Sequence, residues 1–256
     1  HVDLKSNEDD FKNATKTIPN IHFISERYDV QWGSISIVLA TLALIEELAK
    51  DSQFVYSHAH LISGEDLLIK PIDRLLDYFS TNHEKNYINI APLPIKGWWN
   101  GGWYRITDYH FGKSKRSKSY IGKVIRRLYH YSYLLLPFLK KQLPKDLIFY
   151  GGSAWWSLSR NSINHIQEYY TKNPKFIDFL KYSLLPDELF FQTIIMNNPH
   201  KTNIVPDYKR FIKWEGRDKT SPELITFDDI NDLKRSDAFF ARKINIEVSK
   251  ELYRLP

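Results

Sequence analysis

The amino-acid sequence predicts an α/β fold, because short apolar segments with strand character alternate with longer segments of helical periodicity. The composition is that of a globular protein, with 43% hydrophobic and 26% charged residues. The 256 residues suffice for one large domain or two small ones. No internal repeat, low-complexity tract or clear linker divides them, so we predict a single domain over residues 1–256. No run reaches the ~18 apolar residues that a membrane-spanning helix needs.

Helices are predicted where apolar residues recur every three or four positions. The segment Ile35–Lys50 shows this spacing clearly, and Ser34 before it suits the N-cap position. The remaining predicted helices begin at proline or follow a residue that can cap them: Pro71–Phe79, Arg160–Tyr170 after Ser159, Pro174–Tyr182, Pro186–Met196 and Phe227–Arg235.

Strands are predicted at short apolar runs bounded by polar residues, namely Ile21–Ser25, Phe54–Ile62, Tyr87–Ile90 and Leu147–Leu158. His58 and His60 share one face of the second run. Two such histidines could bind a metal, but no third ligand is evident nearby, and we favour a structural role. Glu65 and Asp66 follow the same strand, and we assign no metal to them.

The net charge and the absence of cysteine indicate which binding partners and which cellular compartment suit this protein. The net charge of +6 and the pI near 9.2 favour an anionic partner. Residues 113–145 are basic and interleaved with Tyr and Leu. A face for anionic membranes and an ordinary solvated helix face explain this stretch equally well. No DNA- or RNA-binding motif accompanies the charge, so no nucleic-acid partner is predicted.

The absence of cysteine fits a reducing compartment, and no signal peptide is visible. We expect a cytoplasmic protein, peripheral at the inner face of the membrane.

Aromatic residues are abundant, at 15% with seven Trp. Three of the tryptophans, Trp98, Trp99 and Trp103, lie in a glycine-containing loop between Ile95 and Tyr109. A large core takes part of the aromatic surplus. A loop this rich in Trp is nevertheless expected to pack down as a lid or to form a cleft that stacks on flat ligands, including sugar rings.

The stretch Pro186-Asp187-Glu188 places two adjacent carboxylates at the head of an apolar run. Proline and acidic residues both suit the first turn of a helix, so the local pattern alone favours an ordinary helix start. At most one of two neighbouring side chains can point into the core, and the other is free to point into a cleft.

Several stretches, in their order along the chain, resemble the core-2/I-branching β-1,6-N-acetylglucosaminyltransferase family, which includes the peptide O-xylosyltransferases. Bacterial members look most similar, since cysteines and a membrane anchor are absent here. The matching stretches are His1-Val2-Asp3-x-Lys5, Val30-Gln31-Trp32-Gly33-Ser34, His60 to Lys70, Gly152-Ser153-Ala154-Trp155-Trp156, Pro186-Asp187-Glu188, Arg210 to Trp214, and Phe240-Ala241-Arg242-Lys243.

The resemblance implies a GT-A-type fold with a mixed, mostly parallel sheet flanked by helices. It also implies an inverting, metal-independent glycosyltransferase that needs no cofactor. This enzyme would move a sugar, most often N-acetylglucosamine, from a UDP-sugar to a hydroxyl of a carbohydrate or glycolipid acceptor, in polysaccharide biosynthesis. UDP-xylose as donor, a non-catalytic carbohydrate-binding relative, and a basic scaffold at membranes remain alternatives.

The resemblance also carries residue roles. Glu188 matches the catalytic base. Residues expected near the UDP-sugar are Asp3, Trp32, Lys243 and either Arg217 or Lys219, and residues expected near the acceptor are Trp214, Arg105 and Trp103. Family members begin with a strand and a helix before the stretch that matches His1-Val2-Asp3, so the sequence is expected to lack the first strand-helix unit of the fold.

Overall fold

A computed structural model describes residues 1–50, 55–110, 124, 128, 132, 136, 140–200, 203–214 and 221–254. Its contacts group the chain into two compact units, each assembled from three separate segments. Unit 1 comprises His1–Val55, Ile90–Ala154 and Asn164–Pro199, and unit 2 comprises Tyr56–Asn89, Trp155–Ile163 and His200–Pro256. The interpretation of the chain as a single domain stays a prediction.

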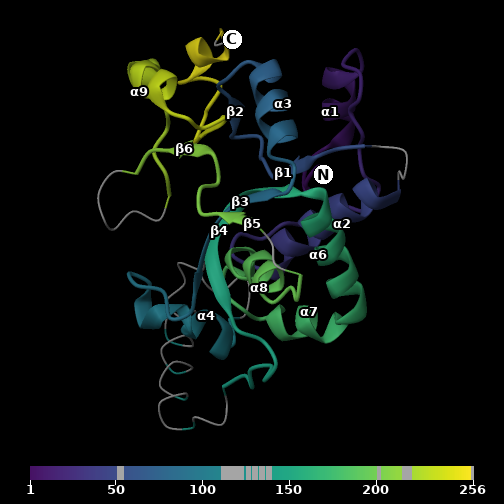
Figure 1. Ribbon diagram of the computed structural model, residues 1–256, viewed down its shortest axis with the longest axis vertical. Helices are drawn as coiled ribbons and strands as arrows, with labels where there is room; N and C mark the ends of the chain where they lie inside the picture. The colour runs from purple at the N-terminus through teal and green to yellow at the C-terminus, as the bar shows by residue number, and fades with distance from the viewer. Residues whose placement is uncertain are drawn as a thin grey trace. The chain divides into compact units, whose positions relative to one another are not determined.

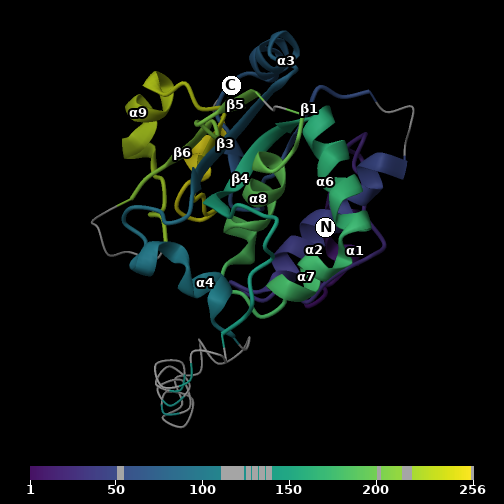
Figure 2. The same ribbon diagram turned by 60° about the horizontal axis from the view of Figure 1, so that its bottom comes forward.

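Unit 1 is mostly helical. Its elements are α1 (Glu8–Thr15), α2 (Ile35–Lys50), the 3-10 helix η1 (Trp99–Gly102), α4 (Tyr104–Thr107), most of α6 (Arg160–Lys172), α7 (Pro174–Leu180), the 3-10 helix η4 (Pro186–Glu188) and α8 (Phe190–Met196). Helices α2, α6, α7 and α8 form one group in both ribbon views (Figures 1 and 2). The core of this unit lies among them, because α8 buries Phe190, Phe191 and Ile194 completely.

Unit 2 holds most of the strands. Its elements are β1 (His58–His60), β2 (Leu67–Leu68), α3 (Ile72–Thr81), β5 (Asn203–Val205), β6 (Arg210–Ile212), the 3-10 helix η5 (Phe227–Asp229), α9 (Ile230–Arg235), β7 (Phe240–Arg242) and the 3-10 helix η6 (Lys250–Arg254). Strands β3 (Lys85–Pro92) and β4 (Tyr150–Ser159) contribute residues to both units.

The strands form a four-stranded sheet in the order β1-β4-β3-β5 and a three-stranded sheet in the order β2-β7-β6. The pairs β1–β4 and β2–β7 are antiparallel, whereas β3–β5 and β6–β7 are parallel. The described part of the chain is thus a mixed α/β structure, as predicted, with parallel and antiparallel pairs in equal number among these four.

Most predicted elements are confirmed, and α2 has the predicted bounds. The Ser34 hydroxyl caps this helix by accepting a hydrogen bond from the Ser36 amide at 3.2 Å. The prediction of a strand over Ile21–Ser25 is wrong, since this stretch has no regular secondary structure. The stretch His1-Val2-Asp3 likewise has no regular secondary structure. Apolar side chains alone do not make a strand, because its backbone groups also need a neighbouring strand to pair with.

The histidine pair of β1 forms hydrogen bonds within the fold. His58 Nε2 lies 2.7 Å from the Lys85 carbonyl oxygen, and His60 Nδ1 lies 2.7 Å from the Ser157 hydroxyl. Burial, together with the charge of Arg210, lowers the pKa of His60 to about 3, so the ring stays neutral. No group of three or more His, Cys, Asp or Glu side chains among the described residues is arranged to hold a metal ion.

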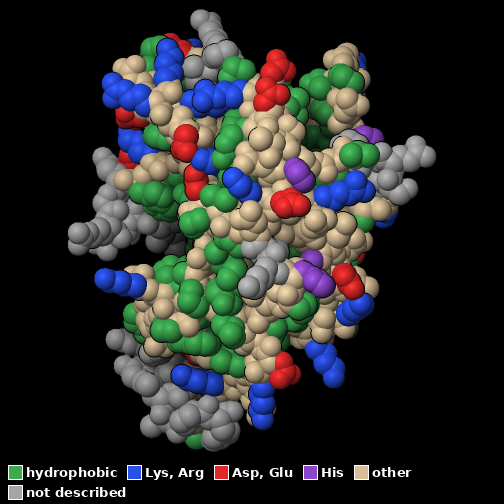
Figure 3. Space-filling model, viewed as in Figure 1, with side chains coloured by type: hydrophobic (Ala, Val, Ile, Leu, Met, Phe, Trp, Pro, Cys, Tyr) green, Lys and Arg blue, Asp and Glu red, His purple; other side chains and the backbone are tan. Residues whose placement is uncertain are grey.

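Membrane contact was predicted for residues 113–145, which fall mostly outside the described residues. Lys141, one of the basic residues of this stretch, is buried in unit 1. Its ammonium donates to the Ser183 hydroxyl at 2.8 Å and lies 4.4 Å from the centre of the Phe179 ring. On the face shown in Figure 3, the coloured basic side chains are interspersed with acidic ones. None of the described helices is sufficiently long and apolar to cross a membrane.

Candidate active site

Glu188 lies in unit 1, at the end of the 3-10 turn η4 that precedes α8. Leu185 starts this turn in the left-handed conformation, with φ at 49°. Its amide donates to the Gly33 carbonyl oxygen at 3.0 Å, and its carbonyl oxygen accepts from the Glu188 amide at 3.1 Å. The turn is thereby fixed to the loop before α2, which carries Trp32. The buried residues of α8 anchor it from the other side, so the position of the Glu188 backbone is well defined.

The Glu188 carboxylate forms an ion pair with the guanidinium of Arg105, a residue of α4. The arginine is only 9% exposed, and its guanidinium carbon lies 3.6 Å from the centre of the Trp98 ring. The side chain of Glu188 is 28% exposed. Arg105 was predicted to bind the acceptor. In the structure it is buried between the Trp98 ring and the Glu188 carboxylate, to which its guanidinium donates a hydrogen bond.

Two glycines allow Trp98 to lie in this place. A Cβ atom on Gly102 would lie 2.6 Å from Trp98 Cε3, and one on Gly151 would lie 2.9 Å from Trp98 Cη2. Only glycine leaves room for the indole ring at both positions. The loop therefore packs down at Trp98. Trp99 is 63% exposed, and Trp103 packs edge-on against Phe149.

Asp187 lies next to the candidate base but turns inward. The residue is 8% exposed, and its Oδ1 atom has no hydrogen-bond partner in the described structure. Burial raises the pKa of the Asp187 carboxyl from 3.8 to about 7. The neighbouring Glu188 charge contributes to this rise in pKa, whereas the Asp187 backbone amide and Arg105 act in the opposite direction. The two adjacent carboxyl groups thus differ in environment: one is buried and holds a proton readily, and the other is paired and partly exposed.

Replacing Asp187 by Asn should reduce the pH dependence of stability. A carboxyl whose pKa is higher in the folded chain binds more protons when folded, so its contribution is complete below about pH 4 and is lost as the pH rises through about 7. The loss in the wild-type protein is on the order of 4 kcal/mol at most. We expect chemical denaturation to show a smaller fall in unfolding free energy between pH 5 and pH 8 in Asp187→Asn. The exposed Asp178→Asn serves as control, and an unchanged pH dependence in Asp187→Asn contradicts the prediction.

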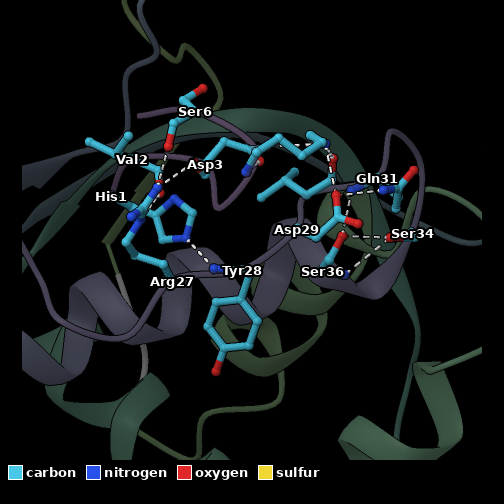
Figure 4. Close-up of polar contacts among 12 residues, drawn as sticks. His1, Val2, Asp3, Ser6, Arg27, Tyr28, Asp29, Gln31, Ser34 and Ser36 are labelled. Carbon is cyan, nitrogen blue, oxygen red and sulfur yellow. Dashed lines mark hydrogen bonds and ion pairs between the residues drawn. The ribbon is translucent and has the colours of Figure 1, made fainter. Parts of the chain in front are cut away.

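The N-terminal stretch lies beside the loop that carries Trp32, within the same unit (Figure 4). Arg27 holds this stretch by donating to the carbonyl oxygens of Val2, Asp3 and Ser6, at 2.7 to 3.1 Å. The Asp3 carboxylate pairs with Lys5, whose ammonium also reaches the Val30 carbonyl oxygen at 2.6 Å. Trp32 is 60% exposed. Lys5 thus connects Asp3 to Val30, which lies two residues before Trp32 in the sequence. Asp3 and Trp32 were both predicted near the UDP-sugar.

Unit 2 holds the other described site candidates. Lys243 follows β7, and its ammonium lies 2.8 Å from a carboxylate oxygen of Glu65. Trp214 follows β6 and is 54% exposed. The two alternatives for the second diphosphate cation, Arg217 and Lys219, lie outside the described residues.

The structure thus brings Glu188, Arg105, Trp98 and the loop of Trp32 together in unit 1, and it places Lys243 and Trp214 in unit 2. Two features of the site could not be predicted from the sequence. One is the role of Arg105 as partner of Glu188, which residues 83 positions apart cannot reveal. The other is the pairing of Lys243 with Glu65, for which the adjacent acidic residues after Ser63 were the available signal.

A family model described as "Core-2/I-Branching enzyme" matches residues 1–236. The chain belongs to the core-2/I-branching enzyme family.

The similar curated proteins that we compare with the chain are all xylosyltransferases. Xylosyltransferase oxt of Drosophila melanogaster is 24% identical over 200 residues, which is 77% of this chain and 20% of that protein. Xylosyltransferase 2 of Canis lupus familiaris is 23% identical over 277 residues, covering 100% of this chain and 29% of that protein. Xylosyltransferase 1 of Rattus norvegicus is 23% identical, covering 98% of this chain and 30% of that protein. The chain therefore spans less than a third of the length of these relatives.

Proposed function

We propose that this protein is an inverting, metal-independent glycosyltransferase of GT-A-type fold, which transfers a sugar from a UDP-sugar to a hydroxyl of a carbohydrate or glycolipid acceptor. The observation that supports this most directly is the environment of Glu188. Its carboxylate is held by a buried arginine yet remains partly exposed, as a general base must be to reach a substrate. Family membership supports the same reaction class.

In the proposed reaction, the Glu188 carboxylate removes the proton from the acceptor hydroxyl, within about 2.6–3.2 Å of it. The acceptor oxygen then attacks the anomeric carbon from the face opposite the diphosphate. The bond between the anomeric carbon and the diphosphate oxygen breaks, and UDP leaves with the electron pair. The configuration at the anomeric carbon is inverted.

The leaving diphosphate gains negative charge as its bond breaks, and cations close to it lower the barrier. We assign this role to Lys243 and to one of Arg217 and Lys219. Asp3 and Trp32 are assigned to the uridine and donor, and Trp214 and Trp103 to the acceptor ring. Arg105 is assigned to positioning Glu188, because its guanidinium is engaged by that carboxylate.

The donor sugar has two candidates. N-acetylglucosamine is the first, from the resemblance to the branching enzymes. Xylose is the second, and the names of the similar proteins favour it. The cytoplasmic location, membrane contact through residues 113–145 and a part in polysaccharide biosynthesis are proposals that rest on the sequence.

A donor screen tests the proposed function. The purified protein is incubated with a panel of UDP-sugars, and thermal stabilisation and UDP release are measured with and without EDTA. We expect one UDP-sugar to raise the melting temperature, because a ligand of the folded state stabilises it, and we expect release to persist in EDTA. Loss of release in EDTA contradicts metal independence. Stabilisation by free sugars but by no UDP-sugar would instead favour a carbohydrate-binding relative without transfer activity.

A further inference from the structure

Two adjacent cations in unit 2 face two adjacent carboxylates. Arg242 ends β7 and is followed by Lys243, while Glu65 and Asp66 precede β2. A guanidinium nitrogen of Arg242 lies 3.3 Å from Asp66 Oδ2, and the Lys243 ammonium lies 2.8 Å from Glu65 Oε1. Two positive and two negative charges are thereby matched in one cluster.

The pair of Arg242 and Asp66 is fixed. Asp66 accepts hydrogen bonds from the Ser63 amide at 2.7 Å and the Ser63 hydroxyl at 2.6 Å, and its side chain is 0% exposed. The Arg242 guanidinium carbon lies 3.8 Å from the centre of the Trp155 ring. Both charges are thus held on several sides, and exchange of either for a ligand would leave the other buried without its partner, which is strongly unfavourable.

Glu65 is held differently. Its side chain is 50% exposed, and the described residues that form ion pairs with its carboxylate are the two cations, with Arg242 more distant at 3.9 Å. Its backbone is fixed separately, because the Glu65 carbonyl oxygen accepts from the Ile244 amide at 2.9 Å. The carboxylate can therefore rotate into solvent while the backbone around Lys243 keeps its place.

We propose that Glu65 is a displaceable counter-ion for Lys243, which leaves the ammonium when an anionic ligand of the diphosphate class binds there. This inference rests on the proposed function, since it concerns the cation assigned to the leaving diphosphate. When the Glu65 carboxylate moves away, the cluster keeps one net positive charge, and the negative charge of the diphosphate balances it. Glu65 thus neutralises Lys243 in the empty protein and competes with the ligand, so it sets how strongly the site binds anions.

Calorimetry with the full chain tests this, using inorganic pyrophosphate and UDP as separate probes. Exposed ion pairs contribute little, so Glu65→Gln should tighten pyrophosphate binding about two- to fivefold. The gain should disappear when Lys243→Met is also present. Glu247→Gln is the matched control, because it removes the same charge from an exposed side chain that forms no ion pair among the described residues. Its pyrophosphate affinity should equal that of the wild type.

An unchanged or weaker pyrophosphate affinity in Glu65→Gln overturns the inference. A gain in affinity that remains in the double variant with Lys243→Met also overturns it, as does the absence of pyrophosphate binding to both the wild type and Glu65→Gln. The UDP measurements report on the proposed function separately. If UDP binds no more tightly than pyrophosphate, the proposed nucleotide site is contradicted, whereas the displacement of Glu65 from Lys243 is not. Thermal melting of each variant establishes that it is folded.

Discussion

Glu188→Gln should lower the rate of sugar transfer by about 10²- to 10⁴-fold, the range that a general base contributes. The amide keeps the shape of the side chain and can still accept a hydrogen bond from Arg105, but it cannot take the acceptor proton. The donor lies on other residues in the proposed arrangement, so UDP affinity should stay within about twofold of the wild type. Initial transfer rates at saturating donor, together with UDP calorimetry, measure both effects.

Glu168→Gln provides the control for this variant. It removes an exposed carboxylate of α6 that pairs with Lys172 at 2.5 Å, and transfer should continue at the wild-type rate. Full activity of the Glu188→Gln protein would remove Glu188 from the proposed mechanism.

Arg105→Ala should lower the transfer rate by about 10- to 100-fold, because a displacement of the catalytic group by about 1 Å can cost 10²-fold. The substitution removes both the partner of Glu188 and the planar group that lies against Trp98. It leaves a hollow beneath the indole ring that matches a guanidinium ion. Added guanidinium at millimolar concentration should therefore restore part of the lost rate, which a general loss of stability would not allow.

Arg105→Lys refines this prediction. Lysine keeps the charge but lacks the planar, forked group, so the rate should fall between those of the wild type and Arg105→Ala. Arg74→Ala, at an exposed arginine of α3, should change neither the rate nor its response to guanidinium. If guanidinium fails to raise the rate of Arg105→Ala, the positioning role is contradicted.

Much of the fold could be predicted from local pattern. The period of apolar residues and the cap at Ser34 define α2 fully, because both signals lie within a few residues of the helix. Strand bounds were less predictable, since β1 and β7 depend on partners far away in the sequence. Ile21–Ser25 has the composition of a strand but no regular secondary structure. The apolar pattern alone cannot distinguish such a stretch from a true strand.

The candidate site likewise has features that could be predicted from the sequence and features that could not. Glu188 could be selected because Pro186, the acidic pair and the following apolar run are contiguous, and the family resemblance favoured the second carboxylate. The buried state of Asp187 also fits the expectation that one of two neighbouring side chains points inward. The Arg105 pairing could not be predicted, since the approach of α4 to η4 is created by tertiary packing around Trp98. The same holds for Glu65 and Lys243, which antiparallel pairing of β2 with β7 brings close.

The segmental make-up of the two units has a consequence for biosynthesis. Each unit collects three stretches of chain, and their order along the sequence alternates. Unit 1 therefore lacks its last stretch until Pro199 has been synthesised, and unit 2 needs residues beyond His200. A nascent chain that has emerged only as far as α7 exposes the surface that α8 later buries. Each unit is interrupted along the sequence by stretches of the other, unlike domains that follow one another, so no single truncation yields either unit free of segments of the other.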